Sequence, residues 1–378
     1  MQKTQISLIL PTLNEEENIG ILLPKIKDIL QEFTYEVIVV DDNSVDKTRY
    51  VAEKFFEINK NGFVLHRTSS YGLSAAIYDG FNLASGHFLI VMDADLQHDE
   101  KILPQIINKL SNKECDVCIA SRNIENGGYG NLSIMRKLLS KFGIWLANFF
   151  LDMKLSDPMS GYFGLSGSLF DEIKASINPR GFKILLEILY KSYNINIAHI
   201  PYNFKVRKFG KTKLTPAIGF EYLLALLDLR LGWVISYRFL QFGFVGFIGS
   251  CINFTFFMIF LSLSIPALWS VFYAASFGMI WSFLANNFFT FSEYRYSRKK
   301  LFLGLLIYLI FSLPGILVQI SVTSFLMNLI EGIAGFNIYL YFLYLIAVIS
   351  GAALNYVIHL NVTWKKLGFN IHPPRIRK

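Results

Sequence analysis

Val91-Met92-Asp93-Ala94-Asp95-Leu96-Gln97-His98 is the stretch on which the prediction of the fold rests. It completes an apolar run, residues 87–91, that is typical of a buried β-strand. Asp93 and Asp95 therefore stand at the carboxyl end of that strand, where open α/β sheets place their ligand crevice. Two carboxylates on one face of extended backbone repel, and a divalent cation with Gln97 as a further oxygen ligand would relieve the repulsion. Taken alone, so short a pattern favours an exposed acidic turn.

Strands alternate with helices on both sides of this stretch. Apolar periodicity predicts strands over residues 5–10, 36–40, 62–66, 87–91 and 117–120, and helices over residues 14–30, 73–84 and 101–110. This alternation predicts a doubly wound, mostly parallel sheet of the α/β class. Because the carboxyl ends of parallel strands share one edge, Glu15, Asp41 and the two aspartates converge there. That convergence favours a nucleotide and metal crevice over an acidic turn.

Two local patterns concern structure more than function. Asn14 and Glu17 have the spacing of a capping box at the start of the first helix. Cys115 and Cys118 form a C-x-x-C in a strand-like run, where residues three apart face opposite ways. We therefore assign the two cysteines no redox or metal-binding role.

The chain is 53% hydrophobic with a net charge of +8, and both properties are unevenly distributed. Residues 239–261, 268–291, 301–326 and 336–360 form apolar segments, each able to cross a hydrocarbon core of about 30 Å. Lys and Arg gather before the first segment, between the second and third, and after the fourth. The positive-inside rule then predicts a multi-pass membrane protein whose first half and both termini are cytoplasmic. Positive charge beside the membrane favours anionic lipid and phosphate as partners over nucleic acid.

Two further segments indicate contact with lipid or with an anion. Residues 131–150 carry an apolar and aromatic stripe at helical spacing, with Lys137 and Lys141 off it. This pattern fits a core-facing helix or an interfacial helix, and the membrane segments that follow favour the second. Residues 206–213 are a basic run with a glycine hinge, which fits a solvated loop or a loop that closes over substrate. Residues 217–231, preceded by Pro216, predict another amphipathic helix that leads to the membrane.

The motifs of the first half resemble those of the inverting GT-A glycosyltransferases of family 2. In chain order they are Pro11-Thr12-Leu13-Asn14-Glu15, Val39-Val40-Asp41-Asp42-Asn43-Ser44, Asp93-Ala94-Asp95-Leu96-Gln97-His98, Ser121-Arg122, Asp157-Pro158-Met159-Ser160-Gly161-Tyr162-Phe163, Gly181-Phe182-Lys183-Ile184-Leu185-Leu186-Glu187 and the run Arg207 through Lys213. Together, over about residues 5 to 230, they resemble the polyprenyl-phosphate (dolichol-phosphate) mannose synthase group. The second half resembles the small GtrA-type membrane domain.

The resemblance implies how the chain is divided. We expect a GT-A glycosyltransferase domain at residues 1–215 and an amphipathic juxtamembrane linker at residues 216–235. A four-helix GtrA-like transmembrane domain would occupy residues 236–364, and residues 365–378 would be a basic cytoplasmic tail.

The resemblance also implies roles for the residues at matching positions. The nucleotide would be bound by Pro11, Leu13, Glu15, Val39, Asp41, Asp93, Ala94, Asp95, Gln97, Arg207 and Lys213. Mg²⁺ or Mn²⁺ would be bound by Asp93, Asp95 and Gln97. The phosphate of the acceptor would contact Arg122, Arg136 and Ser140. The catalytic residues would be Asp95, Arg122, Asp157, Arg207 and Lys213.

The reaction implied is metal-dependent, inverting transfer of mannose from GDP-mannose to a polyprenyl (dolichyl) phosphate, which gives a β-linked lipid-phosphate sugar. The family usually has tyrosine where this chain has Leu13, and an aromatic ring there can pack on the base. UDP-glucose or another nucleotide hexose is therefore an alternative donor. A lipid-linked sugar flippase is a further hypothesis, motivated by the four apolar segments. A processive polysaccharide synthase is disfavoured because the chain has no Q-x-x-R-W signature.

Overall fold

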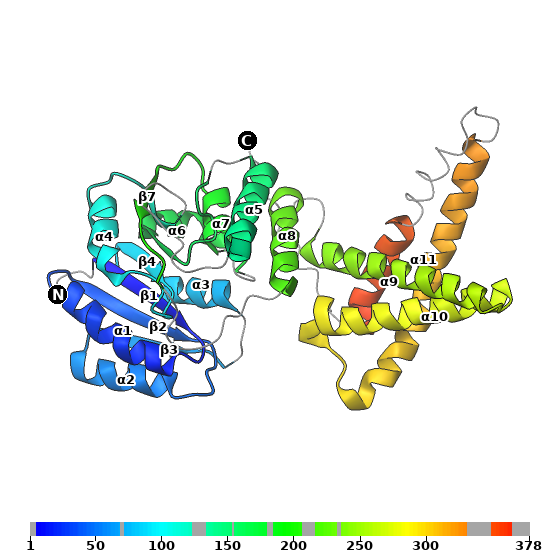
Figure 1. Ribbon diagram of the computed structural model, residues 1–378, viewed down its shortest axis with the longest axis horizontal. Coiled ribbons are helices and arrows are strands. Elements are labelled where there is room, and N and C mark those ends of the chain that lie inside the picture. Colours follow the sequence, from blue (N-terminus) through cyan, green and yellow to red (C-terminus); the bar gives the residue numbers. More distant parts are fainter. Residues whose placement is uncertain are drawn as a thin grey trace. The chain divides into compact units, whose positions relative to one another are not determined.

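The computed structural model describes residues 5–68, 72–122, 134–152, 155–179, 184–205, 216–232, 236–330 and 349–364. The chain divides into two compact units, Met1–Arg230 and Leu231–Lys378 (Figure 1). The first unit contains the β-strands, and the described residues of the second are mainly helical.

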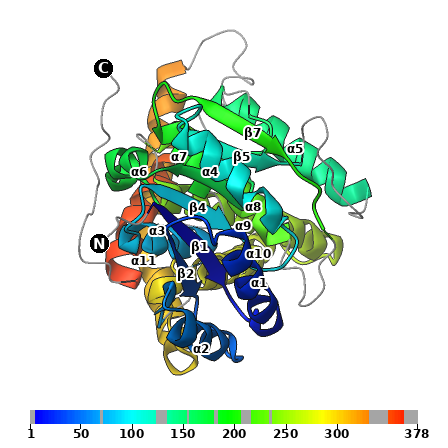
Figure 2. The ribbon, with the colours of Figure 1, turned by 90° about the vertical axis from the view of Figure 1, so that its left-hand side faces the viewer.

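In the described part of the first unit, seven strands form one sheet in the order β3-β2-β1-β4-β6-β5-β7. Figure 2 labels β1, β2, β4, β5 and β7 of this sheet. Their bounds are β1 Ile6–Thr12, β2 Tyr35–Asp41, β3 Gly62–His66, β4 Phe88–Met92, β5 Val117–Ser121, β6 Tyr162–Ser166 and β7 Ile197–Pro201. β6 runs antiparallel to both of its neighbours, and the other paired strands are parallel. The predicted doubly wound, mostly parallel sheet is confirmed. Periodicity did not predict β6 or β7.

Helices cover both faces of the sheet, because alternate residues of each strand enter opposite core layers. One layer receives side chains from α1 (Glu16–Ile29), α2 (Thr48–Asn59) and α4 (Leu103–Ser111). The other layer receives side chains from α3 (Leu73–Leu83), α5 (Ile134–Leu151), α6 (Gly167–Ile173), α7 (Ile184–Lys191) and α8 (Pro216–Leu231). α2, α6 and α7 were not predicted from periodicity.

The prediction that Cys115 and Cys118 face opposite ways is wrong. Cys115 lies before the first residue of β5, outside the strand's alternation, and both thiols are buried in the same core layer. The neighbouring Cys115 thiol and burial raise the pKa of Cys118. The Cys118 thiol therefore stays protonated at neutral pH.

The predicted capping box at the start of α1 is also wrong. Glu15, rather than Asn14, is the N-cap residue, and its side chain makes no capping bond. The end of the β2–α2 loop and the start of α2 satisfy the backbone instead, because the Glu15 N–H donates to Thr48 Oγ1 at 2.8 Å and the Glu16 N–H to Asp46 Oδ2 at 3.3 Å. Asn14 bonds the same loop, accepting from the Val45 N–H at 2.9 Å.

The described helices of the second unit are α9 (Tyr237–Ser262), α10 (Ala267–Ala285), α11 (Leu301–Ile330) and residues 349–358. These helices overlap the four predicted apolar segments, the last of which lies partly outside the described residues. Within the described residues, Tyr237–Phe260 is the one segment long and apolar enough to cross a membrane by length and composition. Two π-helical turns, Asn286–Thr290 and His359–Thr363, end α10 and the last helix.

Candidate functional site

The loop after β4 carries the acidic motif in a strained backbone conformation. Leu96 has a φ of 60°, in the left-handed region that residues other than glycine avoid. Its side chain is buried in the core layer of α1 and α4, and this packing holds the strained turn. Asn14 and Asn43, in the loops after β1 and β2, also have positive φ. Asparagine adopts this region readily, so the strain lies at Leu96, and strained residues of that kind are typical of ligand sites.

Asp93 is held by a chain of hydrogen bonds from distant elements. Its Oδ2 lies 3.3 Å from His98 Nε2, and His98 Nδ1 lies 2.9 Å from the Tyr202 hydroxyl, just beyond β7. A carboxylate only accepts, so Nε2 carries the ring proton and Nδ1 accepts from Tyr202. Burial raises the pKa of Tyr202, which keeps this hydroxyl protonated as a donor. From the sequence we predicted a role for neither residue. The position of His98 directly after the acidic motif could have indicated it, but no motif surrounds Tyr202.

Gln97 and Lys205 join the acidic loop to the segment after β7. The Gln97 side-chain Nε2 donates to the Lys205 carbonyl at 3.1 Å, and the Lys205 N–H donates to the Gln97 carbonyl at 2.8 Å. Lys205 Nζ also lies 3.0 Å from both Asp99 and Glu100. Burial by itself would raise the pKa of Glu100, but bonds from Lys25 and Lys205 lower it to about 2. These bonds tie the acidic loop to the segment after β7.

The donor set of the acidic loop fits a hard divalent cation by chemistry. Asp93 and Asp95 supply carboxylates, and the Gln97 amide is oriented with its nitrogen toward Lys205 and its oxygen away from it. Asp95 is 7% exposed, and its Oδ1 accepts from the Gln97 N–H at 3.1 Å. Among the described residues, no three His, Cys, Asp or Glu side chains gather as a metal site. The predicted set instead combines two carboxylates with the side-chain amide of Gln97.

Arg122 and Asp157, both predicted to be catalytic, lie together. Arg122 follows β5 and Asp157 precedes β6, and Arg122 Nε lies 3.3 Å from Asp157 Oδ2. The guanidinium also stacks over the Phe204 ring, 4.7 Å from its centroid. Asp157 is almost fully buried, so this pairing compensates its charge.

Asp41 ends β2, which lies two positions from β4 in the sheet. Its carboxylate is fully buried, and Oδ2 lies 3.0 Å from His66 Nδ1 and 3.4 Å from the Ser44 N–H. Oδ1 is buried too, without a hydrogen-bond partner among the described residues. Glu15 Oε2 accepts from Asn18 Nδ2 at 2.6 Å, which orients that carboxylate at the start of α1.

The remaining nucleotide-site residues lie at the ends of the same strands. Pro11 is the penultimate residue of β1 and pairs in register with Val40 of β2. Leu13, just past β1, is partly exposed, and Ala94 is buried between the two aspartates. Val39 is fully buried in the core layer, two residues inside the strand end.

Several predicted residues fall outside the described parts of the chain. Arg207 and Lys213 belong to residues 206–215, which lie outside them. Arg136 lies in α5, and its side chain is outside the described residues. Ser140, one turn later in α5, is partly buried.

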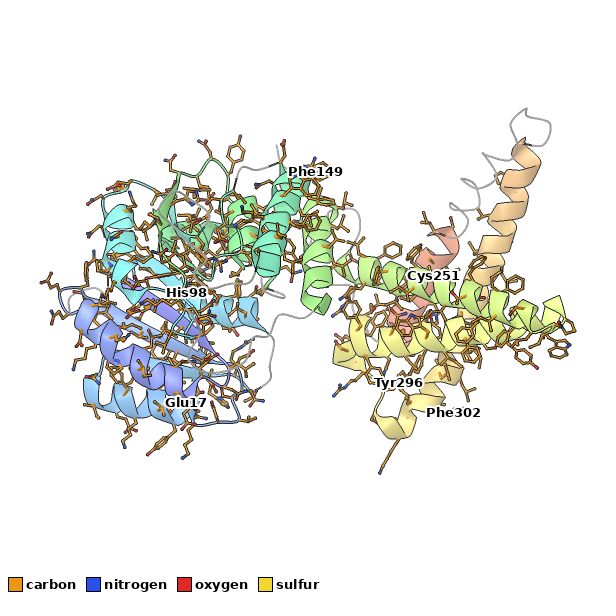
Figure 3. All side chains as sticks on the ribbon, in the orientation of Figure 1. Glu17, His98, Phe149, Cys251, Tyr296 and Phe302 are labelled. Atoms are coloured by element: carbon orange, nitrogen blue, oxygen red, sulfur yellow. The ribbon has the colours of Figure 1, made fainter. Side chains whose placement is uncertain are left out.

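α5 buries one edge and exposes another. Ala147 and Leu151 enter the core, while the predicted aromatic stripe is more than half exposed at Phe142, Trp145 and Phe149. Phe149 is labelled in Figure 3. The three rings stack in sequence, with centroids 5.7 Å and 5.6 Å apart. Apart from its core-facing edge, α5 thus presents a continuous aromatic ridge.

Two families match the two units. Residues 7–174 match the family described as glycosyl transferase family 2, and residues 241–364 match the GtrA/DPMS transmembrane domain.

Curated relatives match across both parts. A dolichol-phosphate mannosyltransferase of Pyrococcus furiosus is 34% identical over 364 residues, covering 95% of this chain and 99% of that protein. A dolichol-phosphate mannosyltransferase of Mycosarcoma maydis is 32% identical over 247 residues, covering 63% of this chain and 81% of that protein. Among solved structures, glucosyl-3-phosphoglycerate synthase of Mycobacterium tuberculosis is 21% identical, with a TM-score of 0.45 over 60% of this chain and 80% of that one.

Proposed function

Because this chain belongs to glycosyl transferase family 2, with a GtrA/DPMS transmembrane domain, and is a glycosyltransferase, we propose that it transfers mannose from GDP-mannose to a polyprenyl (dolichyl) phosphate. The product would be the β-linked lipid-phosphate sugar. The observation that carries the proposal is the placement of Asp41, Asp93 and Asp95 at the carboxyl ends of β2 and β4, on either side of β1, with the Arg122–Asp157 pair at the end of β5. The named activity of the near full-length Pyrococcus relative supports the choice of sugar and acceptor.

The donor would lie along this edge. Pro11, Leu13, Glu15, Val39 and Asp41 would hold the nucleoside, and Asp93 with Ala94 would meet the ribose and diphosphate. Asp95 and Gln97, with Asp93, would bind Mg²⁺ or Mn²⁺. A bound divalent cation would neutralise charge on the departing diphosphate. Arg122, Arg207 and Lys213 would bind phosphate oxygens, a role for which guanidinium and ammonium groups are suited.

The proposed reaction is a single displacement at the anomeric carbon. An oxygen of the lipid phosphate forms the new bond to that carbon while the bond to the diphosphate oxygen breaks, and GDP departs with the electron pair. A phosphate monoester has a second pKa of about 6, so the nucleophile is largely ionised at neutral pH and needs no general base. Asp157, held by Arg122, would orient the sugar, and a general-base role is its alternative. Attack opposite the leaving group inverts the configuration.

The acceptor would reach the site from a bilayer. Arg136 and Ser140, four residues apart in α5, would contact its phosphate. The exposed ridge of Phe142, Trp145 and Phe149 supports an interfacial position for α5, with the rings in lipid. The protein is membrane-associated through its GtrA/DPMS domain. Four membrane spans and a cytoplasmic catalytic unit are part of the proposal, supported by the distribution of Lys and Arg.

A donor screen tests the proposal directly. The full chain, reconstituted in vesicles containing a polyprenyl phosphate, would be given GDP-mannose or UDP-glucose with and without Mg²⁺ or Mn²⁺. We expect a mannosylated lipid from GDP-mannose only when metal is present. Transfer from UDP-glucose with none from GDP-mannose would overturn the donor assignment. Movement of lipid-linked sugar across the vesicle without transfer would favour the flippase.

A further inference from the structure

Asp41 is the last residue of β2 and Asp42 follows it, and the structure gives the two aspartates different partners. Asp42 is paired with the buried Arg67, which also lies 3.0 Å from Asp79. Asp41 is paired with His66, the last residue of β3. The parallel register sets Asp41 opposite His66, so both side chains stand at the carboxyl edge where the donor would bind. Asp42 thus belongs to an ion-pair network, whereas Asp41 has only one charged or titratable partner among the described residues.

Only one of the two oxygens of the Asp41 carboxylate has hydrogen-bond partners among the described residues. Oδ2 has the His66 ring nitrogen at 3.0 Å and the Ser44 N–H at 3.4 Å. Oδ1 has no partner in the described residues, although the side chain is only 1% exposed. A buried acceptor without a donor is unfavourable, and such atoms in native proteins call for a ligand, an ion or a water. The atom is an oxygen of a carboxylate, so a cation or a hydrogen-bond donor can complete it, and a nucleobase supplies the donor.

We propose that His66 is a positioning residue for recognition of the donor's base: by donating to Oδ2, it orients Asp41 so that Oδ1 accepts from a ring N–H of the nucleobase. This inference deepens the proposed function and rests on the nucleotide site being at this edge. Guanine presents such a donor at N1 and uracil at N3. Adenine and cytosine present ring-nitrogen lone pairs there, which a carboxylate repels. The pair would therefore exclude those two bases.

The competing explanation is that His66 only satisfies a buried carboxylate of the fold. That explanation predicts a loss of thermal stability when His66 is changed, without selective loss of nucleotide affinity. Asparagine separates the two accounts, because its side-chain amide can donate from a position close to that of Nδ1. Leucine fills a similar volume and has no donor.

The experiment compares His66→Leu, His66→Asn and Asp41→Asn in the full chain in detergent. His87→Leu is the matched control, since His87 is exposed at the opposite end of the sheet, just before β4. Calorimetry would measure binding of GDP and of N1-methyl-GDP, which lacks the ring N–H. Steady-state kinetics would give kcat and the two KM values.

We expect His66→Leu to weaken GDP binding about tenfold, the loss of roughly one hydrogen bond to a charged group. The KM for GDP-mannose should rise by a similar factor, with the KM for acceptor unchanged and kcat within about twofold. His66→Asn should restore most of the affinity. N1-methylation should cost the wild type about tenfold and cost His66→Leu much less, because the contact is already lost.

Wild-type affinity in His66→Leu, or equal weakening in His66→Leu and His66→Asn, would overturn the inference. Failure of the proposed function has a different signature. If Asp41→Asn leaves nucleotide affinity unchanged, the base lies elsewhere and the nucleoside site itself is misassigned. If the wild type binds UDP and not GDP, only the donor assignment fails, and the same variants tested with UDP and 3-methyl-UDP still decide the role of His66.

Discussion

Gly161 lies directly against the carboxylate of Asp93: a Cβ atom at position 161 would overlap both Asp93 oxygens. The Gly161 carbonyl also accepts a hydrogen bond from the Asp93 N–H at 3.2 Å. Gly161 immediately precedes β6, the antiparallel strand beside β4, so the absence of a side chain there lets the two chains approach. With His98 bonded to Oδ2, Asp93 is confined on two sides.

Gly161→Ala should therefore displace Asp93 and lower kcat/KM about a hundredfold, because misplacement of about 1 Å at a reacting centre costs that much. Turnover with GDP-mannose measures the effect. Gly20→Ala is the control, since the nearest atom to its Cβ position is Val51 Cγ1 at an ordinary 3.6 Å. Wild-type turnover in Gly161→Ala would show that the position of Asp93 does not matter to the reaction.

Tyr202→Phe should lower kcat/KM for the donor about five- to tenfold while keeping the aromatic packing. The substitution removes the hydroxyl that donates to His98 Nδ1, and the His98–Asp93 bond loses its orientation. Tyr222→Phe is a matched control, because the Tyr222 hydroxyl donates at 2.8 Å to the Gly143 carbonyl, away from the acidic loop. If the two variants lose equal stability and equal activity, the His98–Tyr202 contact is structural only.

Asp95→Asn and Gln97→Ala should each abolish metal-dependent turnover and leave the fold intact. Asp95→Asn replaces a charged carboxylate ligand of the predicted cation with a neutral amide, and Gln97→Ala removes an oxygen ligand. We expect at least about a hundredfold loss of kcat from each. Metal titrations of turnover and far-ultraviolet circular dichroism measure the two properties. Asp171→Asn, on the exposed side of α6, is the control. Near wild-type turnover with an unchanged metal requirement would remove these residues from the mechanism.

Glu100→Gln should destabilise the protein at pH 7 by about 1–2 kcal/mol, because it breaks the bonds to Lys25 and Lys205, which are themselves partly exposed. The pKa of Glu100 is depressed to about 2 from an ordinary 4.5, so its contribution is full above pH 4.5 and fades as the pH falls toward 2. The Tm gap between wild type and variant should thus be constant from pH 7 to pH 5 and shrink below pH 4.5. A gap that widens in acid would contradict this assignment.

Arg136→Ala should raise the KM for the lipid acceptor far more than the KM for GDP-mannose. Loss of one bond to a charged phosphate costs about 1.5–3 kcal/mol, which is roughly a ten- to hundredfold change. Lys141→Ala, an exposed cation one turn further along α5, is the control of equal charge. Titration of each substrate separately decides the matter. Equal shifts in both constants, or none, would mean that the acceptor phosphate binds elsewhere.

The features that the sequence alone determined depend on residues close together in the chain. The alternation of strands and helices, the D-x-D at a strand end and the apolar second half follow from periodicity and hydrophobicity within short windows. β3 has the bounds that its apolar pattern predicts, and β4 differs by one residue at each end. These features depend on neighbours in the chain, so no knowledge of strand order is needed to find them.

Tertiary structure decided which residues meet. Tyr202 bonds His98 from 104 residues away, and Asp41 meets His66 only because β2 and β3 are parallel and in that register. Gly161 reaches Asp93 because β6 enters the sheet beside β4 in the opposite direction. The α1 backbone is likewise capped from another loop, which is why the local capping pattern at Asn14 failed. Strand order, direction and register are set by the burial of both faces of the sheet at once. The free energy of that burial depends on the whole unit, so no single segment of the sequence reveals it.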